Sequence, residues 1–163
     1  TGRGRRYATQ QLNRAYAVLL ASHFQGACRD LHSECVDAIV DSISPSSLRL
    51  IVRRSLSLNR QLDRGNASPG SLGSDFKRLG VAVWDKLQSR DSKSTAWNAA
   101  LESLNQWRNA IAHQDFTSTH FVGATALQLP TVKQWRRDCG RLVAALDDVM
   151  YDHLAGLTGT SPW

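Results

Sequence analysis

An arginine, an asparagine and a histidine stand close together near the end of a strongly helical stretch: Arg108, Asn109 and His113. A guanidinium binds phosphate through two parallel N–H donors and keeps its charge at every physiological pH. An imidazole can take up and return a proton near neutral pH, and a carboxamide can hydrogen-bond a phosphate or the imidazole. These three side chains therefore favour phosphodiester chemistry that requires no metal ion.

Helical geometry determines which of these side chains share a face. Asn109 and His113 are four residues apart and point the same way. Arg108 lies about 140° around the axis from His113, but its long stem can reach a shared ligand. A groove made with a second helix, or with a second copy of this helix, would bring the groups together. An alternative stays open, because an arginine near a helix end usually faces solvent and a histidine there often only caps the helix.

The length of 163 residues and the hydrophobic fraction of 42% predict one globular domain over residues 1–163. We expect its ends, residues 1–6 and 157–163, to be flexible. The net charge of +6 favours a polyanionic partner.

The chain has no apolar run near the roughly 18 residues of a membrane span, and no signal-peptide pattern follows its basic start. Its three cysteines show no disulfide-framework spacing. These observations predict a cytoplasmic protein with reduced thiols. Because the chain begins with Thr1 instead of methionine, a longer parent protein stays open.

Apolar periodicity and turn residues indicate helices along most of the chain. The expected helices run from about Tyr7 to Ile43, Pro45 to Leu62, Ser74 to Leu87, Thr95 to Ala112 and Pro130 to Leu154. Residues 115–129 lack a helical period, and we expect a loop there that could hold a short hairpin. The sequence thus predicts an all-α fold, an antiparallel bundle of four to five helices with a short irregular or hairpin insertion before the last helix.

The first expected helix changes character along its length. Its apolar stripe includes Leu12 and Leu19, but the same spacing carried forward meets Asp30 and Glu34. The apolar residues meanwhile shift to another face of the helix: Cys28, Leu31, Cys35 and Ile39. Either the helix bends near Gly26 and its acidic face is solvated, or the inner stripe becomes acidic and lines a polar groove. The first alternative is favoured because charged side chains usually stay in water.

Cys28, His32 and Cys35 also share a helical face, which would suit three ligands of a metal site. No fourth ligand is evident, and buried cysteines are common on helices, so we expect no metal and no cofactor.

Two further groups of side chains have competing interpretations. A set of basic residues could contact phosphates or simply form a solvated helix face: Arg49, Arg53, Arg54, Lys133, Arg136 and Arg137. Trp107 and Trp135 could stack on bases, although core packing is the favoured interpretation for aromatic residues at helical spacing.

The segment from Arg108 through Asn109 to His113 resembles the Arg-x4–6-His signature of the HEPN superfamily, in which Asn, Asp or His commonly follows the arginine. Residues 15–37 and 107–116 resemble the RiboL-PSP-HEPN-type bacterial branch, and residues 60–74 match it least. The resemblance implies an α-helical bundle that dimerises, so that two copies of the motif face each other across a cleft. Many such domains are metal-independent endoribonucleases of toxin–antitoxin and anti-phage systems.

The resemblance also implies roles for particular residues. Arg108 and His113 would be the catalytic pair, with Asn109 in support, and RNA the substrate. The ribose 2′-hydroxyl would attack the adjacent phosphate, leaving a 2′,3′-cyclic phosphate and a 5′-hydroxyl, so DNA would not serve. A further set would bind or orient the RNA, against the alternative of a plain exposed helix face: Arg29, His32, Glu34 and Gln114.

The expected partners are RNA, a second copy of the chain, and an antitoxin or another regulatory domain or protein. No membrane is expected. Two other functions remain open. One is a catalytically silent HEPN-like module that binds RNA, nucleotides or protein, and the other is a helical domain that only mediates oligomerisation.

Overall fold

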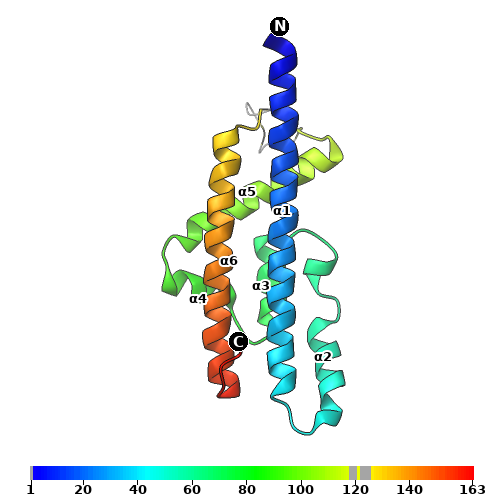
Figure 1. Cartoon of the computed structure of the whole chain (residues 1–163), viewed down its shortest axis with the longest axis vertical. Coiled ribbons are helices and arrows are strands. Elements are labelled where there is room, and N and C mark those ends of the chain that lie inside the picture. Colours follow the sequence, from blue (N-terminus) through cyan, green and yellow to red (C-terminus); the bar gives the residue numbers. More distant parts are fainter. Residues whose placement is uncertain (1, 118–120, 122–125) are drawn as a thin grey trace.

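The computed structural model describes residues 2–117, 121 and 126–163, and these residues form helices but no strand. Its elements are α1 (Gly2–Asp41), η1 (Ser46–Leu48), α2 (Arg49–Ser57), η2 (Gln61–Asp63), α3 (Pro69–Lys77), α4 (Val83–Arg90), α5 (Ser94–His113) and α6 (Leu129–Thr158), where η1 and η2 are single 3₁₀ turns. Figure 1 shows α1 and α6 as two long rods that span the molecule. The all-α class is confirmed.

The two longest helices run side by side in the same direction (Figure 1). Near the start of α1, Asn13 donates a hydrogen bond to the carbonyl of Leu127, just ahead of α6, over 2.8 Å. At the other end, Asp41 and Thr160 line the same hollow. The expected antiparallel relation holds instead between α1 and α2, which returns alongside it (Figure 1).

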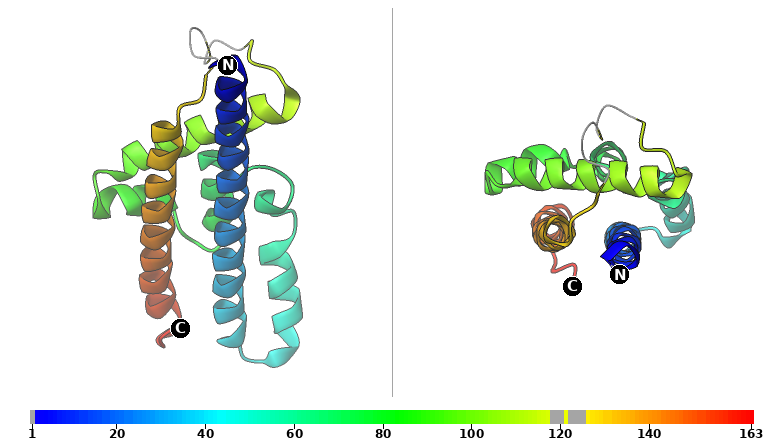
Figure 2. Two further views of the ribbon diagram at one scale, coloured as in Figure 1. Left: turned by 45° about the horizontal axis from the view of Figure 1, so that its top comes forward. Right: turned by 90° about the horizontal axis from the view of Figure 1, so that it is seen from above.

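Helix α5 packs against both α1 and α6 and crosses them, as the view from above in Figure 2 shows. Its C-terminal end extends beyond α1. This crossing places the segment that ends at His113 at the margin of the bundle, while the middle of the helix covers the core. Both tryptophans in question, Trp107 and Trp135, are buried, which confirms that they pack in the core.

Helix α1 turns a different face inward from the one its apolar stripe predicts. Leu12 and Leu19 are 71% and 56% exposed, so the expected stripe lies largely on the outer surface. The buried positions begin with Asn13, Ala17 and Phe24. The short side chains of Asn13 and Ala17 allow close contact with the neighbouring helices, and the ring of Phe24 fills the core. The prediction failed because the packing partners, and not apolar character alone, decide which face is covered.

Neither alternative offered for the acidic half of α1 describes it fully. The helix continues unbroken past Gly26, and its acidic residues are exposed. Two of them form ion pairs with α2: Asp37 with Arg53, and Asp41 with Arg49. The acidic face is therefore partly covered by the arginines of α2 and does not line an inner groove.

The helix expected from Ser74 to Leu87 is two helices, and the first begins earlier than predicted. Ser68 caps α3, because its Oγ accepts a hydrogen bond from the backbone N–H of Ser71, and a proline follows it at the first helical position. Gly80 then adopts a φ of +87°, in the left-handed region that glycine tolerates best, and separates α3 from α4.

The expected helix from Pro45 to Leu62 is also interrupted: η1 and α2 are followed by a break at Asn59, whose φ is +59°, and then by η2. Residues 118–120 and 122–125, in the segment where a short hairpin was considered, lie outside the described residues. Phe121, which is described, is buried against Trp107. Among the described residues, no helix has the combination of length and apolar character that crossing a membrane requires.

Candidate functional site

The last turns of α5 carry the predicted motif on the solvent-facing side of the helix. Trp107 and Ala110 are buried, whereas Arg108 is half-buried and Asn109 and His113 are exposed. The core contacts of Trp107 and Ala110 fix the rotation of the helix, so the polar side chains of the motif must point outward. Asn109 and His113 therefore share one face of the helix, as their four-residue spacing predicts.

The helix ends directly after His113 because Gln114 takes a left-handed conformation with a φ of +55°. The side-chain amide of Gln114 donates to the carbonyl of Ile111 over 2.9 Å, and the N–H of Asp115 donates to the carbonyl of Ala110 over 3.0 Å. Carbonyls that a helix end leaves open are thus satisfied. Gln114, a predicted substrate-binding residue, lies beside His113 and caps the helix.

Arg108, Asn109 and a residue from a distant loop form a hydrogen-bonded row. The guanidinium Nη1 of Arg108 donates to Oδ1 of Asn109 over 3.1 Å. The amide Nδ2 of Asn66, in the loop between η2 and α3, donates to the same oxygen over 2.6 Å. Sequence reasoning missed Asn66, since a separation of 43 positions along the chain leaves no local signal of the contact.

The imidazole of His113 is open to solvent and makes no hydrogen bond within the described part of the chain. Asp115 lies near it, and this carboxylate accepts hydrogen bonds from the hydroxyl and backbone N–H of Thr117 over 2.6 and 2.9 Å. Those two hydrogen bonds, with a smaller contribution from the charge of His113, lower the pKa of Asp115. At neutral pH an anionic carboxylate therefore stands beside the histidine.

Aromatic side chains form a cluster on the buried side of the end of α5. Trp107 contacts Phe116 and Phe121, with ring centroids 6.0 and 4.9 Å apart. The guanidinium of Arg14, from α1, lies 4.6 Å from the centroid of the Phe116 ring, and its buried Nε has no hydrogen-bond partner in the described structure. A second arginine thus approaches the segment that follows the motif.

His32 is buried in the core, so the structure does not place it at a surface where the predicted contact with RNA could be made. Its side chain is 0% exposed and packs edge-on against Phe76, while Nε2 lies 3.3 Å from the carbonyl oxygen of Asp75 and Nδ1 lies 3.4 Å from Arg60. Burial, followed by the nearby charge of Arg60, lowers the pKa of His32. The sequence held one signal of this burial, because His32 shares a helical face with Cys28 and Cys35, which are buried as well.

Arg29 and Glu34 are exposed on α1, as predicted, but the described contacts do not bring them to the motif. The backbone carbonyl of Arg29 accepts a hydrogen bond from Arg60, which also pairs with Asp63. These contacts connect Arg29 with η2. Their predicted role in RNA binding stays a prediction.

The three cysteines are buried and free. Burial raises the pKa of the thiols of Cys35 and Cys139 to about 12, and it raises that of Cys28 as well. Among the described residues, no group of three or more His, Cys, Asp or Glu side chains is placed to hold a metal ion.

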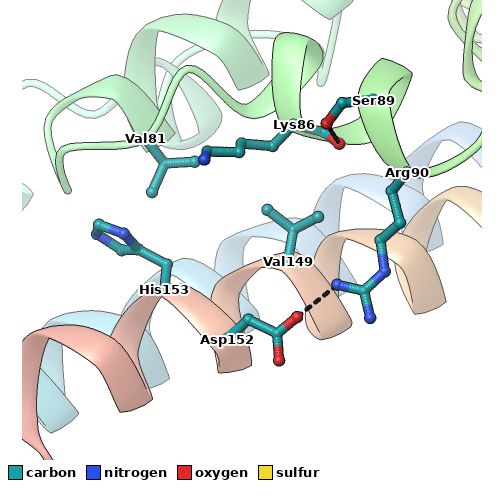
Figure 3. A pocket seen from close by; sticks show the side chains of 7 residues that line it. All are labelled: Val81, Lys86, Ser89, Arg90, Val149, Asp152 and His153. Carbon is teal, nitrogen blue, oxygen red and sulfur yellow. Dashed lines mark hydrogen bonds and ion pairs between the residues drawn. The ribbon is translucent and has the colours of Figure 1, made fainter.

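A pocket of about 340 Å³ lies between α4 and α6 (Figure 3), and none of its lining residues belongs to the motif. Lys86 extends along it from α4, and His153 lines it from α6, where its Nε2 lies 2.9 Å from the carbonyl oxygen of Leu79. Arg90 and Asp152 form an ion pair of 2.6 Å between the two helices. The pocket therefore lies beside contacts that hold α4 against α6.

The structure is an all-helical bundle whose crossing helix ends in an exposed polar and basic site, and the family match gives the class of this domain as HEPN. More particularly, the family model RiboL-PSP-HEPN matches residues 4–152, and the chain belongs to this family. Domains of the HEPN superfamily are often ribonucleases and often bind RNA. No curated protein and no solved structure matches the chain.

Proposed function

We propose that this domain is a metal-independent endoribonuclease in which Arg108 and His113 are the catalytic pair and Asn109 supports them. The observation that carries the proposal is that Arg108, Asn109 and His113 lie together and accessible at the end of α5. Arg108 is held against Asn109 by a 3.1 Å hydrogen bond, and the neighbouring His113 has an exposed imidazole. A phosphate bound beside these three side chains would meet the guanidinium cation of Arg108, the amide donors of Asn109 and the imidazole of His113, which can carry a proton.

The chemistry requires two proton transfers. The 2′-oxygen of the ribose forms a bond to phosphorus and loses its proton to an imidazole. The bond from phosphorus to the 5′-oxygen breaks, and this oxygen takes a proton from an acid. The products are a 2′,3′-cyclic phosphate and a 5′-hydroxyl. Arg108 stabilises the negative charge that grows on the phosphate oxygens in the transition state.

A second copy of the chain completes the site in this proposal. One chain contributes one motif histidine, whereas the reaction needs both a base and an acid. Two copies of α5 that face each other would place two imidazoles and two guanidinium groups around one phosphate. The net charge of +6 on each chain would attract the RNA strand to the cleft between them.

The cellular role that fits this activity is a toxin or anti-phage effector that acts on RNA in the cytoplasm. An antitoxin or another regulatory domain or protein would hold it inactive. Expression of the wild-type domain alone should then arrest bacterial growth, and His113→Ala should restore it.

The decisive test is incubation of purified protein with RNA in the presence of a chelator, followed by analysis of the product ends. Wild type should leave cyclic phosphates, and an RNA with 2′-O-methyl groups should resist cleavage. His113→Ala and Arg108→Ala should each lower the rate by roughly 10²–10⁴-fold, as expected for lost proton transfer and lost transition-state stabilisation. His23→Ala is the matched control, because His23 is exposed elsewhere, on α1.

Three results would count against the proposal. Undiminished cleavage by either motif variant would remove the assigned residues from the reaction. Cleavage of 2′-O-methyl RNA would exclude attack by the 2′-hydroxyl. Tight RNA binding without cleavage by wild type would favour the catalytically silent binding module instead.

A further inference from the structure

The two hydrogen bonds at Asn109 determine which way its carboxamide faces. Arginine has donors and no acceptor, so the atom that faces Arg108 must be the oxygen Oδ1 and not the nitrogen. Because Oδ1 also faces Asn66 over 2.6 Å, the partner atom of Asn66 must be a donor, its Nδ2. The Oδ1 of Asn109 is thus occupied on both sides. Within the described part of the chain no group accepts a hydrogen bond from its own Nδ2–H groups, and Asn109 is exposed on the face that it shares with His113.

The loop that carries Asn66 is fastened to α5 independently of this contact. The next residue, Ala67, is 3% exposed, and its carbonyl accepts a 3.1 Å hydrogen bond from the buried amide of Asn105. Asn105 lies one helical turn before Asn109, so it anchors the loop directly beside the site. Ser68 then caps α3. These buried contacts place Asn66 before any ligand arrives, which is the condition for a preorganised supporting group.

We propose that Asn66 is a positioning residue of the ribonuclease site, acting through Asn109 on Arg108. Its amide donor keeps the Asn109 oxygen turned inward as the acceptor for the Arg108 guanidinium. The same hydrogen bond presents the Asn109 amide nitrogen to an oxygen of the RNA backbone. Without it, the Asn109 carboxamide is free to rotate, and the guanidinium loses the acceptor that holds it in place. This role rests on the proposed endoribonuclease function.

The first test compares cleavage of a defined RNA by wild type and by Asn66→Ala. Because Asn66 orients groups that act in the transition state, kcat should fall roughly five- to tenfold, the value of about one hydrogen bond, while KM changes less. The matched control is Asn98→Ala, the same change at a half-buried position near the other end of α5. Thermal unfolding should show that both variants remain folded. Wild-type kcat in folded Asn66→Ala would overturn the proposal.

An isosteric variant separates the hydrogen-bond donor from simple space filling. Asn66→Asp keeps the shape of the side chain but sets a carboxylate against the Asn109 oxygen and offers Arg108 a competing anion. We expect kcat to fall at least as far as in Asn66→Ala. Wild-type activity in Asn66→Asp would mean that only shape matters and would overturn the donor role.

A double-mutant cycle tests whether Asn66 works through Asn109. If it does, Asn66→Ala should lower kcat little further once Asn109→Ala is present, whereas independent residues give multiplicative losses. Multiplicative losses would overturn the proposed path. Failure of the proposed function is distinguishable from both outcomes, because the wild-type domain itself would then leave the RNA uncut.

Discussion

Asp75 offers the sharpest test of how the fold supports the site. Its side chain is 1% exposed, and its two carboxylate oxygens accept hydrogen bonds from the backbone N–H groups of Gln61 and Leu62 over 2.9 and 2.8 Å. These bonds hold η2, the turn that leads into the loop of Asn66. Replacing Asp75 with alanine would leave both donors without a partner.

The expected loss follows from the surroundings of the two donors. Leu62 is 0% exposed, so water cannot replace the carboxylate at its N–H, which should cost about 1–3 kcal/mol. Gln61 is exposed, and water can partly satisfy its N–H, at about 1 kcal/mol or less. Asp75→Ala should therefore lower the free energy of unfolding by roughly 1–4 kcal/mol, a substantial share of the 5–15 kcal/mol typical of a domain.

Urea denaturation followed by circular dichroism measures this loss, with Asp30→Ala as the control for removal of an exposed acidic side chain. Asp75→Asn keeps one acceptor oxygen and should lose less than Asp75→Ala. Amide hydrogen exchange gives a local measurement, because the N–H of Leu62 should lose protection in both Asp75 variants. A loss below about 1 kcal/mol in Asp75→Ala would refute the reasoning, since it would mean that the two donors find other partners.

Two further predictions concern titratable groups in the core. Because the pKa of His32 is lowered on folding, the unfolded chain binds a proton first as the pH falls below its own pKa of about 6.5. The free energy of unfolding should therefore decline from that pH toward the lowered folded-state pKa. His32→Gln should flatten this decline, as measured by denaturation curves between pH 7.5 and 5. An unchanged slope would contradict the assignment of the decline to His32. The buried thiols of Cys28, Cys35 and Cys139 should not react with Ellman's reagent at pH 8 in the folded protein, but all three should react in guanidinium. Rapid reaction of the folded protein would exclude the burial described for these cysteines.

Much of the secondary structure was predictable because its signals are local. The motif helix was expected from Thr95 to Ala112 and is observed as Ser94–His113. Apolar spacing along one helix is enough to locate such a segment. The break at Gly80 was missed, because a glycine in an apolar periodic segment does not reveal that its φ is positive.

The inward face of α1 was predicted poorly in the first half of the helix, for a different reason, whereas the predicted shift of the apolar face to Cys28, Leu31 and Cys35 is confirmed. The sequence contains apolar residues on more than one face of this helix, among them Leu19 on the outer surface and Phe24 in the core. Only the positions of α5 and α6 decide which of these faces is covered. The same decision buried His32, which had been expected to contact RNA.

The sequence by itself determined that Arg108, Asn109 and His113 lie near the end of one helix, because their spacing acts through the local geometry of the backbone. It also supported the HEPN resemblance that the family match confirms. Only the tertiary structure decided that Asn66 reaches Asn109 across 43 residues. Contacts of this kind depend on how the η2 loop docks on α5, and that docking results from core packing that no local pattern encodes.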